Sequence, residues 1–149
     1  MNAVIACGGT GGHLFPGIAV AEVLQNRGHH VMLLVSEKDI DAVALSGQRN
    51  FQVEKLPTVG LPSLFSPALF GFTRRFVESL ALCRSIYRKF NPHVVLGMGG
   101  FTSTAPVLAG RFRGIATFIH ESNAVPGKAN RWIARAVNAV MLGFKECAP

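Results

Sequence analysis

Short aliphatic runs alternate with longer amphipathic stretches along most of the chain, and this alternation restricts the fold more than any other feature. Strands are predicted at six runs, at 3–7, 31–36, 51–56, 94–98, 116–120 and 139–142. Helices are predicted between them, at 15–27, 40–48, 68–90, 103–113 and 128–137. The runs VVLGM and ATFIH lack polar alternation, as expected of strands covered on both faces. The repeated strand–helix–strand order therefore predicts an α/β fold with a doubly wound parallel sheet.

The length and composition favour one globular domain. The chain has 149 residues, and we expect a single domain over residues 1–149. No run of about 18 apolar residues predicts a transmembrane helix. The first residues, MNAVIACGG, lack the features of a secretion signal, so we expect a cytoplasmic protein. Three distant cysteines, Cys7, Cys83 and Cys147, indicate neither a disulfide scaffold nor a structural zinc site.

Glycine-rich or polar loops follow three predicted strands at their carboxyl ends. They are GGTGGH at 8–13, GGFTST at 99–104 and ESNAVPG at 121–127. In a sheet ordered 3-2-1-4-5, strands one and four flank the point where the topology reverses and a crevice opens. Glycines allow close approach of the backbone to a ligand, and a helix N-terminus attracts anions. We therefore expect the three loops to converge on one cleft that binds a phosphorylated ligand.

These loops match none of the common nucleotide or metal motifs. Leu14 occupies the third glycine position of a dinucleotide fingerprint, and no Gly-Lys-Ser/Thr sequence completes a Walker loop. Ala124 stands where HExxH requires its second histidine, so a zinc protease site is excluded. A nicotinamide-dependent or Walker-type enzyme is therefore disfavoured.

Several side chains in the loops are candidates for chemistry, each with a plain structural alternative. His13 has an ordinary pKa near 6.5 and is a candidate proton acceptor, although many histidines are only structural. Phe101 is expected to be exposed at its loop and to contact a ligand, and Thr102 contacts a ligand or caps the following helix. Glu121 and Asn123 either bind a polar ligand or form the turn.

The charge distribution indicates an anionic partner. The formal net charge is +7, and basic residues cluster at 74–89 and at 111–135. Aromatic side chains precede the first cluster, which is typical of segments in a membrane interface, whereas no RNA-binding motif accompanies them. We predict a membrane patch and no nucleic-acid partner. The predicted patch comprises Leu64, Phe65, Leu69, Phe70, Phe72, Arg74 and Arg75.

The three motifs GGTGGHLFPG, LGMGGFTSTAP and HESNAVPGKANR together closely resemble the amino-terminal domain of the MurG family. Members of this family transfer N-acetylglucosamine from UDP-GlcNAc to lipid I, an undecaprenyl-diphosphate-linked acceptor, to form lipid II of peptidoglycan. The resemblance implies a Rossmann-like domain, the amino-terminal half of a GT-B glycosyltransferase, on the cytoplasmic face of the cell membrane. It also implies inverting chemistry with no cofactor and no metal ion. Ser122 and Phe101 depart from the family pattern, in which glutamine and tyrosine are usual.

The resemblance also implies a role for individual residues. His13 would be the general base that deprotonates the C4 hydroxyl of the acceptor. The acceptor and its diphosphate would contact Gly9, Gly99, Gly100, Phe101, Thr102 and Glu121. The donor sugar would be reached by Thr10, Gly11, Gly12 and Asn123.

The donor-binding domain of the family is absent from these 149 residues. We therefore expect the chain alone to bind acceptor and membrane without turning over. The alternative is a non-catalytic subunit that recruits a separate donor-binding partner to the membrane or binds an anion.

Overall fold

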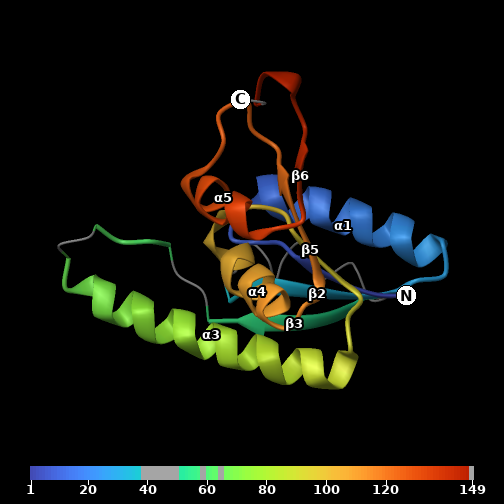
Figure 1. Ribbon diagram of the computed structural model, residues 1–149, viewed down its shortest axis with the longest axis horizontal. Coiled ribbons are helices and arrows are strands. Elements are labelled where there is room, and N and C mark those ends of the chain that lie inside the picture. The colour runs from blue at the N-terminus through green and yellow to red at the C-terminus, as the bar shows by residue number, and fades with distance from the viewer. Residues whose placement is uncertain (38–50, 58–59, 64–65, 148–149) are drawn as a thin grey trace.

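The computed structural model describes residues 1–37, 51–57, 60–63 and 66–147, and these residues form a six-stranded parallel sheet (Figure 1). The predicted helix at 40–48 lies outside the described residues. The strands are β1 (Asn2–Ala6), β2 (His30–Ser36), β3 (Gln52–Leu56), β4 (Val94–Gly97), β5 (Ala116–Glu121) and β6 (Ala139–Leu142). Their order is β3-β2-β1-β4-β5-β6, and every neighbouring pair is parallel. The predicted order 3-2-1-4-5 is confirmed, and β6 extends it.

Helices cover both faces of this sheet (Figure 1). They are α1 (Gly11–Asn26), α3 (Ala68–Phe90), α4 (Gly100–Phe112) and α5 (Lys128–Ile133), and the short 3-10 turns are η1 (Ala134–Ala136) and η2 (Lys145–Cys147). Strand β1 shows how the sequence produces the two layers. Val4 packs into the cluster that contains Tyr87 of α3, while Ile5 points to the other face and packs with Leu14 and Ile18 of α1. Two hydrophobic cores therefore share one sheet.

Two helices begin earlier than their sequence pattern predicts. Helix α1 begins at Gly11 instead of residue 15, and α4 begins at Gly100 instead of residue 103. Glycine is a poor helix former, so the pattern assigned these residues to loops. The predicted helix at 128–137 is also divided, since α5 ends at Ile133 and a 3-10 turn follows. As a consequence, parts of the first two loops form first helical turns.

Helix α3 packs on the sheet only through its carboxyl-terminal half. Its buried residues begin at Ser79, and the buried Tyr87 hydroxyl donates a 3.0 Å hydrogen bond to the Pro106 carbonyl of α4. The amino-terminal half extends past the sheet edge (Figure 1). None of the helices built from the described residues has the length and apolarity needed to cross a bilayer.

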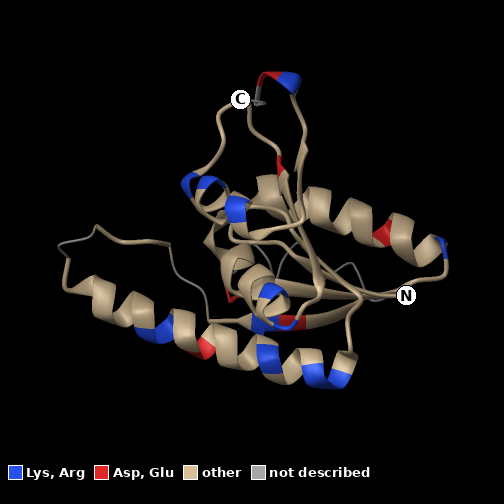
Figure 2. Cartoon of the chain, viewed as in Figure 1, with Lys and Arg blue, Asp and Glu red and all other residues tan. Residues whose placement is uncertain are grey.

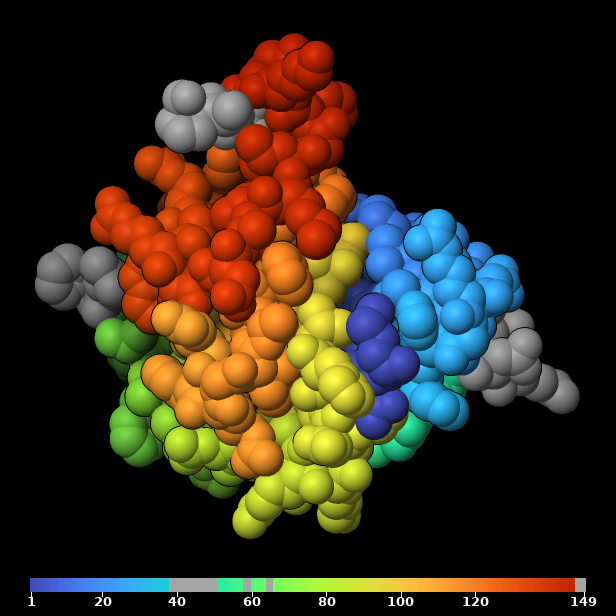
Figure 3. Space-filling view, turned by 45° about the vertical axis from the view of Figure 1, so that its right-hand side comes forward, coloured from blue at the N-terminus to red at the C-terminus, as the bar shows by residue number. Residues whose placement is uncertain are grey.

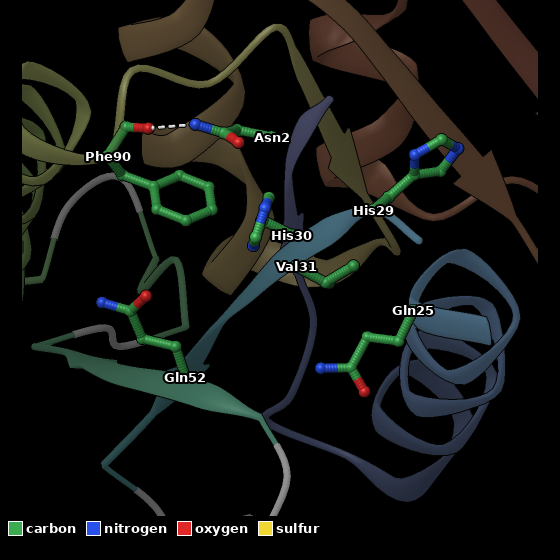
Figure 4. A pocket seen from close by; sticks show the side chains of 7 residues that line it. All are labelled: Asn2, Gln25, His29, His30, Val31, Gln52 and Phe90. Atoms are coloured by element: carbon green, nitrogen blue, oxygen red, sulfur yellow. Dashed lines mark hydrogen bonds between the residues drawn. The ribbon is translucent and has the colours of Figure 1, made fainter. Parts of the chain in front are cut away.

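The amino ends of the strands form the edge of the sheet opposite the glycine loops. Here a cavity of about 520 Å³ is lined by Asn2, Gln25, His29, His30, Val31, Gln52 and Phe90 (Figure 4). The Asn2 amide donates a 2.7 Å hydrogen bond to the Phe90 carbonyl, which joins β1 to the end of α3. The space-filling view shows the N-terminus (dark blue) between α1 (blue) and the chain that leads from α3 into β4 (yellow) (Figure 3).

Candidate functional site

The three predicted loops meet at the carboxyl edge of the sheet. A Cβ atom placed on Gly9 of the first loop would lie 3.1 Å from Thr102 Oγ1 in the first turn of α4. A Cβ atom on Gly99 would lie 2.9 Å from the His13 imidazole and 3.4 Å from the amide nitrogen of Asn130. The first loop therefore touches the second, and the second touches the helix that follows the third. The predicted meeting of the three loops is confirmed.

The His13 imidazole packs against the backbone of the second loop. The contacts at Gly99 leave no room for a side chain, and Gly99 has φ +106°, a conformation that residues other than glycine rarely adopt. A Cβ atom on Gly100 would lie 3.2 Å from Nδ1 of the same ring. Thr10 Oγ1 lies 3.0 Å from His13 Nδ1, within hydrogen-bond distance. The two glycines predicted to contact a diphosphate, Gly99 and Gly100, thus also form the surface on which the His13 ring packs. We call this surface, together with Thr10, the seat of His13.

The surroundings of His13 favour its neutral form. Partial burial lowers the pKa of His13 below its ordinary value of 6.5, the Glu121 carboxylate opposes this shift, and His120 adds to it. An imidazole that is neutral near pH 7 can accept a proton. The shift therefore favours the neutral imidazole, the form that has a lone pair available.

The Glu121 carboxylate organises the third loop. Its Oε1 accepts hydrogen bonds from the Asn123 backbone N–H at 2.9 Å and from the Asn123 amide at 2.8 Å. Its Oε2 accepts from the Gly127 N–H at 2.9 Å and from the Asn130 amide at 3.0 Å. Burial alone would raise the pKa of Glu121, but these hydrogen bonds outweigh it and lower the pKa. Glu121 and Asn123 therefore form the turn, which was one of the two roles open to them.

Asn130 is a site residue that sequence reasoning did not single out. It is buried at 4% exposure, and its amide donates to the His120 carbonyl at 3.0 Å as well as to Glu121. Among the described residues, its Oδ1 and the Nδ1 of His120 have no hydrogen-bond partner. Asn130 stands in the quoted motif HESNAVPGKANR, but nothing in the motif shows that its side chain returns to the strand end. Its position explains how the third loop supports the second.

Two of the helices that start in this region, α1 and α4, have N-termini without a side-chain cap. Thr10 is the N-cap of α1 and Gly99 is the N-cap of α4, and neither makes a side-chain capping hydrogen bond. Neither first turn contains an acidic residue. The proposal that Thr102 caps α4 is wrong, because the helix already begins at Gly100 and Thr102 is buried in its first turn. Since β1 and β4 are neighbours, two positive helix ends lie at the same edge and can attract a polyanion.

Phe101 is not exposed at a loop, in contrast to the sequence prediction. It lies in the first turn of α4, half-buried, and its ring packs edge-to-face on Phe72 at a centroid distance of 5.9 Å. The early start of α4 explains the difference, since it places Phe101 on the side of the first helical turn that faces Phe72 of α3. Phe101 therefore belongs to an apolar region beside the site.

The predicted membrane patch is only partly exposed. Phe70 is 81% exposed, while Leu69 and Phe72 are half-buried. Leu64 and Phe65 lie outside the described residues. Arg74 and Arg75 are exposed and contact Glu78 at 2.9 Å and Glu37 at 3.7 Å respectively. Lys and Arg residues recur along α3 and around α5 (Figure 2).

Among the residues that the structure describes, no group of three His, Cys, Asp and Glu side chains is arranged to share a metal ion.

Comparison with known proteins places this arrangement in a family. Residues 3–142 match the model of the glycosyltransferase family 28 N-terminal domain. The UDP-N-acetylglucosamine–N-acetylmuramyl-(pentapeptide) pyrophosphoryl-undecaprenol N-acetylglucosamine transferase of Trichlorobacter lovleyi is 38% identical over 150 residues, 99% of this chain and 39% of the relative. The enzyme of the same name from Geotalea uraniireducens is 38% identical over 148 residues, 98% of this chain and 40% of the relative.

Solved structures agree with the sequence relatives. The crystal structure of Acinetobacter baumannii MurG matches 99% of this chain and 43% of its own, with a TM-score of 0.83 and 26% identity. The Streptomyces sp. SF2575 glycosyltransferase SsfS6 shares the fold, with a TM-score of 0.64 and 16% identity over 91% of this chain and 45% of its own. The chain thus spans well under half the length of these relatives. It belongs to glycosyltransferase family 28 and corresponds to the N-terminal domain of its MurG members.

Proposed function

We propose that this chain is the acceptor-side domain of an inverting glycosyltransferase. The complete enzyme transfers N-acetylglucosamine from UDP-GlcNAc to the C4 hydroxyl of lipid I and forms lipid II. The names of the relatives, which specify an N-acetylglucosamine transferase and a pyrophosphoryl-undecaprenol acceptor, support this reaction. The observation that carries the proposal is the seat of His13, where a partly buried imidazole is held between Thr10 and the backbone of Gly99 and Gly100.

In the proposed mechanism His13 is the general base. When its Nδ1–H donates to Thr10 Oγ1, the lone pair on Nε2 is available to accept a proton. That proton leaves the C4 hydroxyl as its oxygen attacks the anomeric carbon of the donor sugar. The bond from the anomeric carbon to the UDP oxygen breaks at the same time, and UDP departs with its electron pair. The attack from the opposite side inverts the anomeric configuration.

The helix ends provide the proposed substrate contacts. The acceptor diphosphate lies at the start of α4, near Gly9, Gly99 and Gly100, where backbone N–H groups and the helix dipole stabilise its charge. The donor sugar approaches Thr10, Gly11 and Gly12 at the start of α1. Asn123 is held by Glu121 and presents the third loop to the same region. The remaining donor contacts belong to a second domain.

Reconstitution tests this function. The chain is joined to the donor domain of a relative such as the Trichlorobacter lovleyi enzyme, and transfer from UDP-GlcNAc to a lipid I analogue is assayed. Loss of a general base lowers kcat by about 10²–10⁴-fold, so we expect this loss in His13→Ala. His29→Ala, which changes a histidine at the opposite edge of the sheet, is the matched control and should retain activity. Full activity of His13→Ala would exclude His13 as the base. Complete inactivity of the joined wild-type protein would favour the alternative, a non-catalytic recruiting subunit.

We further propose peripheral attachment to the cytoplasmic face of the membrane through the exposed start of α3. The exposed Phe70 ring and the adjacent Arg74 and Arg75 suit an interface with anionic headgroups. Cosedimentation with phosphatidylglycerol vesicles should decrease in Phe70→Ser and at high salt, because headgroup attraction is screened by ions. Phe112→Ser changes another exposed phenylalanine, at the end of α4, and should leave vesicle binding unchanged. Equal effects of the two substitutions would contradict this surface.

A further inference from the structure

An apolar cavity of about 480 Å³, which the proposed chemistry does not use, lies between α3, α4 and α5. Its walls include Phe72 and Phe76 of α3, Phe101 and Thr104 of α4, and Lys128 and Trp132 of α5. The volume falls within the range of about 300–1,000 Å³ typical of small-molecule sites. The cavity is therefore large enough to hold a ligand or part of one.

Two residues that line the cavity directly follow residues of the candidate site in the sequence. Phe101 directly follows Gly100, whose backbone packs on His13. Lys128 directly follows Gly127, whose N–H is bound by the Glu121 carboxylate. A ligand with its polar end on the glycine loops would therefore reach the cavity with the atoms next to that end.

The walls select an amphiphile with an anionic end. Phe72 stacks on Phe76 at 6.0 Å and meets Phe101 edge-on at 5.9 Å, which gives a continuous aromatic wall. Lys128 is the charged member of the described lining and supplies a positive charge.

We propose that this cavity binds the first isoprene units of a polyprenyl diphosphate, the units next to the diphosphate on the glycine loops. This inference rests on the proposed function and assigns the lipid part of its acceptor to a defined subsite. A peptide segment would leave its backbone N–H and C=O groups without partners on the aromatic wall, whereas a hydrocarbon chain has no such groups. The subsite shares Phe72 with the predicted membrane patch, but the exposed Phe70 is outside the lining.

Trp132 provides a direct measurement of binding. It is the sole tryptophan of the chain, it lines the cavity, and it is 70% exposed. The 149-residue chain is titrated with farnesyl diphosphate, inorganic diphosphate and farnesol, with equilibrium dialysis as a second readout. We expect farnesyl diphosphate to shift Trp132 emission to shorter wavelength. It should also bind at least about tenfold more tightly than inorganic diphosphate, because its farnesyl group buries apolar surface.

A pair of substitutions on α3 separates this subsite from general surface binding. Thr73 lines the cavity at an exposed helix position, so Thr73→Phe fills the cavity without disturbing the core. Val77, one turn later, is exposed and outside the lining, so Val77→Phe is the control. Thr73→Phe should weaken the binding of farnesyl diphosphate by about tenfold and leave the affinity for inorganic diphosphate unchanged. Val77→Phe should change neither affinity.

Each other outcome has a definite meaning. Equal affinity for farnesyl diphosphate and inorganic diphosphate would overturn the subsite and leave the diphosphate site of the proposed function intact. If Thr73→Phe does not change the binding of farnesyl diphosphate, the farnesyl group binds elsewhere on the protein, and this outcome would also overturn the subsite. Failure of all three probes to bind would count against the acceptor role itself, and so against both proposals.

Discussion

The two edges of the sheet are built from the same strands but by different means. At the amino edge, polar contacts such as the bond from Asn2 to the Phe90 carbonyl join the ends of packed elements. Positive-φ residues occur at both edges, for example Gly28 and Gly99, but at the carboxyl edge two helix ends lack side-chain caps, and among the described residues the buried polar atoms His120 Nδ1 and Asn130 Oδ1 have no hydrogen-bond partner. Such features cost stability and are typical of sites that bind ligands. This difference supports the proposal that the carboxyl edge carries the function.

The sharpest test of this comparison exchanges one glycine for alanine at each edge. Gly99→Ala forces an unfavourable backbone and places a Cβ atom 2.9 Å from His13, whereas Gly28 has φ +77° with no atom within 4 Å of its Cβ position. Each substitution should cost about 1–3 kcal/mol of stability from the backbone. Only Gly99→Ala should also displace the base, and a displacement of this kind lowers activity by about 10²-fold.

Transfer assays of the enzyme joined to a donor domain, together with urea unfolding, measure both effects. Equal activity of the two alanine variants would show that the seat of His13 does not depend on the absence of a side chain at residue 99.

A second comparison concerns the polar groups that hold the two edges. Glu121→Gln replaces an acceptor of four hydrogen bonds by an amide with its own donors, and we expect a loss of about 3 kcal/mol. Asn2→Ala removes the bond to Phe90 and should cost about 1 kcal/mol. Urea unfolding at pH 7 measures the difference.

The pH dependence of this difference follows from the lowered pKa of Glu121. Its stabilising contribution is fully present above the ordinary value of 4.5 and is lost as the pH falls through the lowered folded value. The two variants should therefore approach each other in stability at acidic pH. A constant gap down to acidic pH would mean that the charge of Glu121 is not what holds the loop.

The smallest expected effect is on the titration of His13. Its NMR midpoint should lie below 6.5, and Glu121→Gln should lower it further, because the Glu121 carboxylate raises the pKa of His13. Since the folded chain binds fewer protons than the unfolded chain between the lowered value and 6.5, this group makes stability rise with pH across that window. The spectrum of His13→Gln assigns the signal. A midpoint above 6.5 would contradict the lowered pKa.

Much of the fold is predictable from the sequence because it depends on local patterns. The aliphatic runs and the loops after β1, β4 and β5 predict the parallel order and the meeting of the three loops. The helix starts at Gly11 and Gly100 were missed, since glycine signals a loop wherever the surrounding fold does not stabilise it.

The missing parts of the site depend on contacts between distant segments. Asn130 acts through the end of β5, and Phe101 faces Phe72 of another helix. Neither contact has a periodic signal, so residue type and spacing alone do not reveal them. The packing of Gly99 on His13 likewise follows from the pairing of β1 with β4, which places the two loops together.

The seat of His13 determines when, during folding, the proposed catalytic site can form. The imidazole and the backbone beneath it come from segments almost ninety residues apart, and they meet only after the first strand has paired with the fourth. A nascent or partly folded chain carries the histidine but lacks the surface that orients it. Long-range strand pairing is a late and slow event in folding. His13 is therefore oriented only when the tertiary structure has formed, so that activity requires a correctly formed sheet.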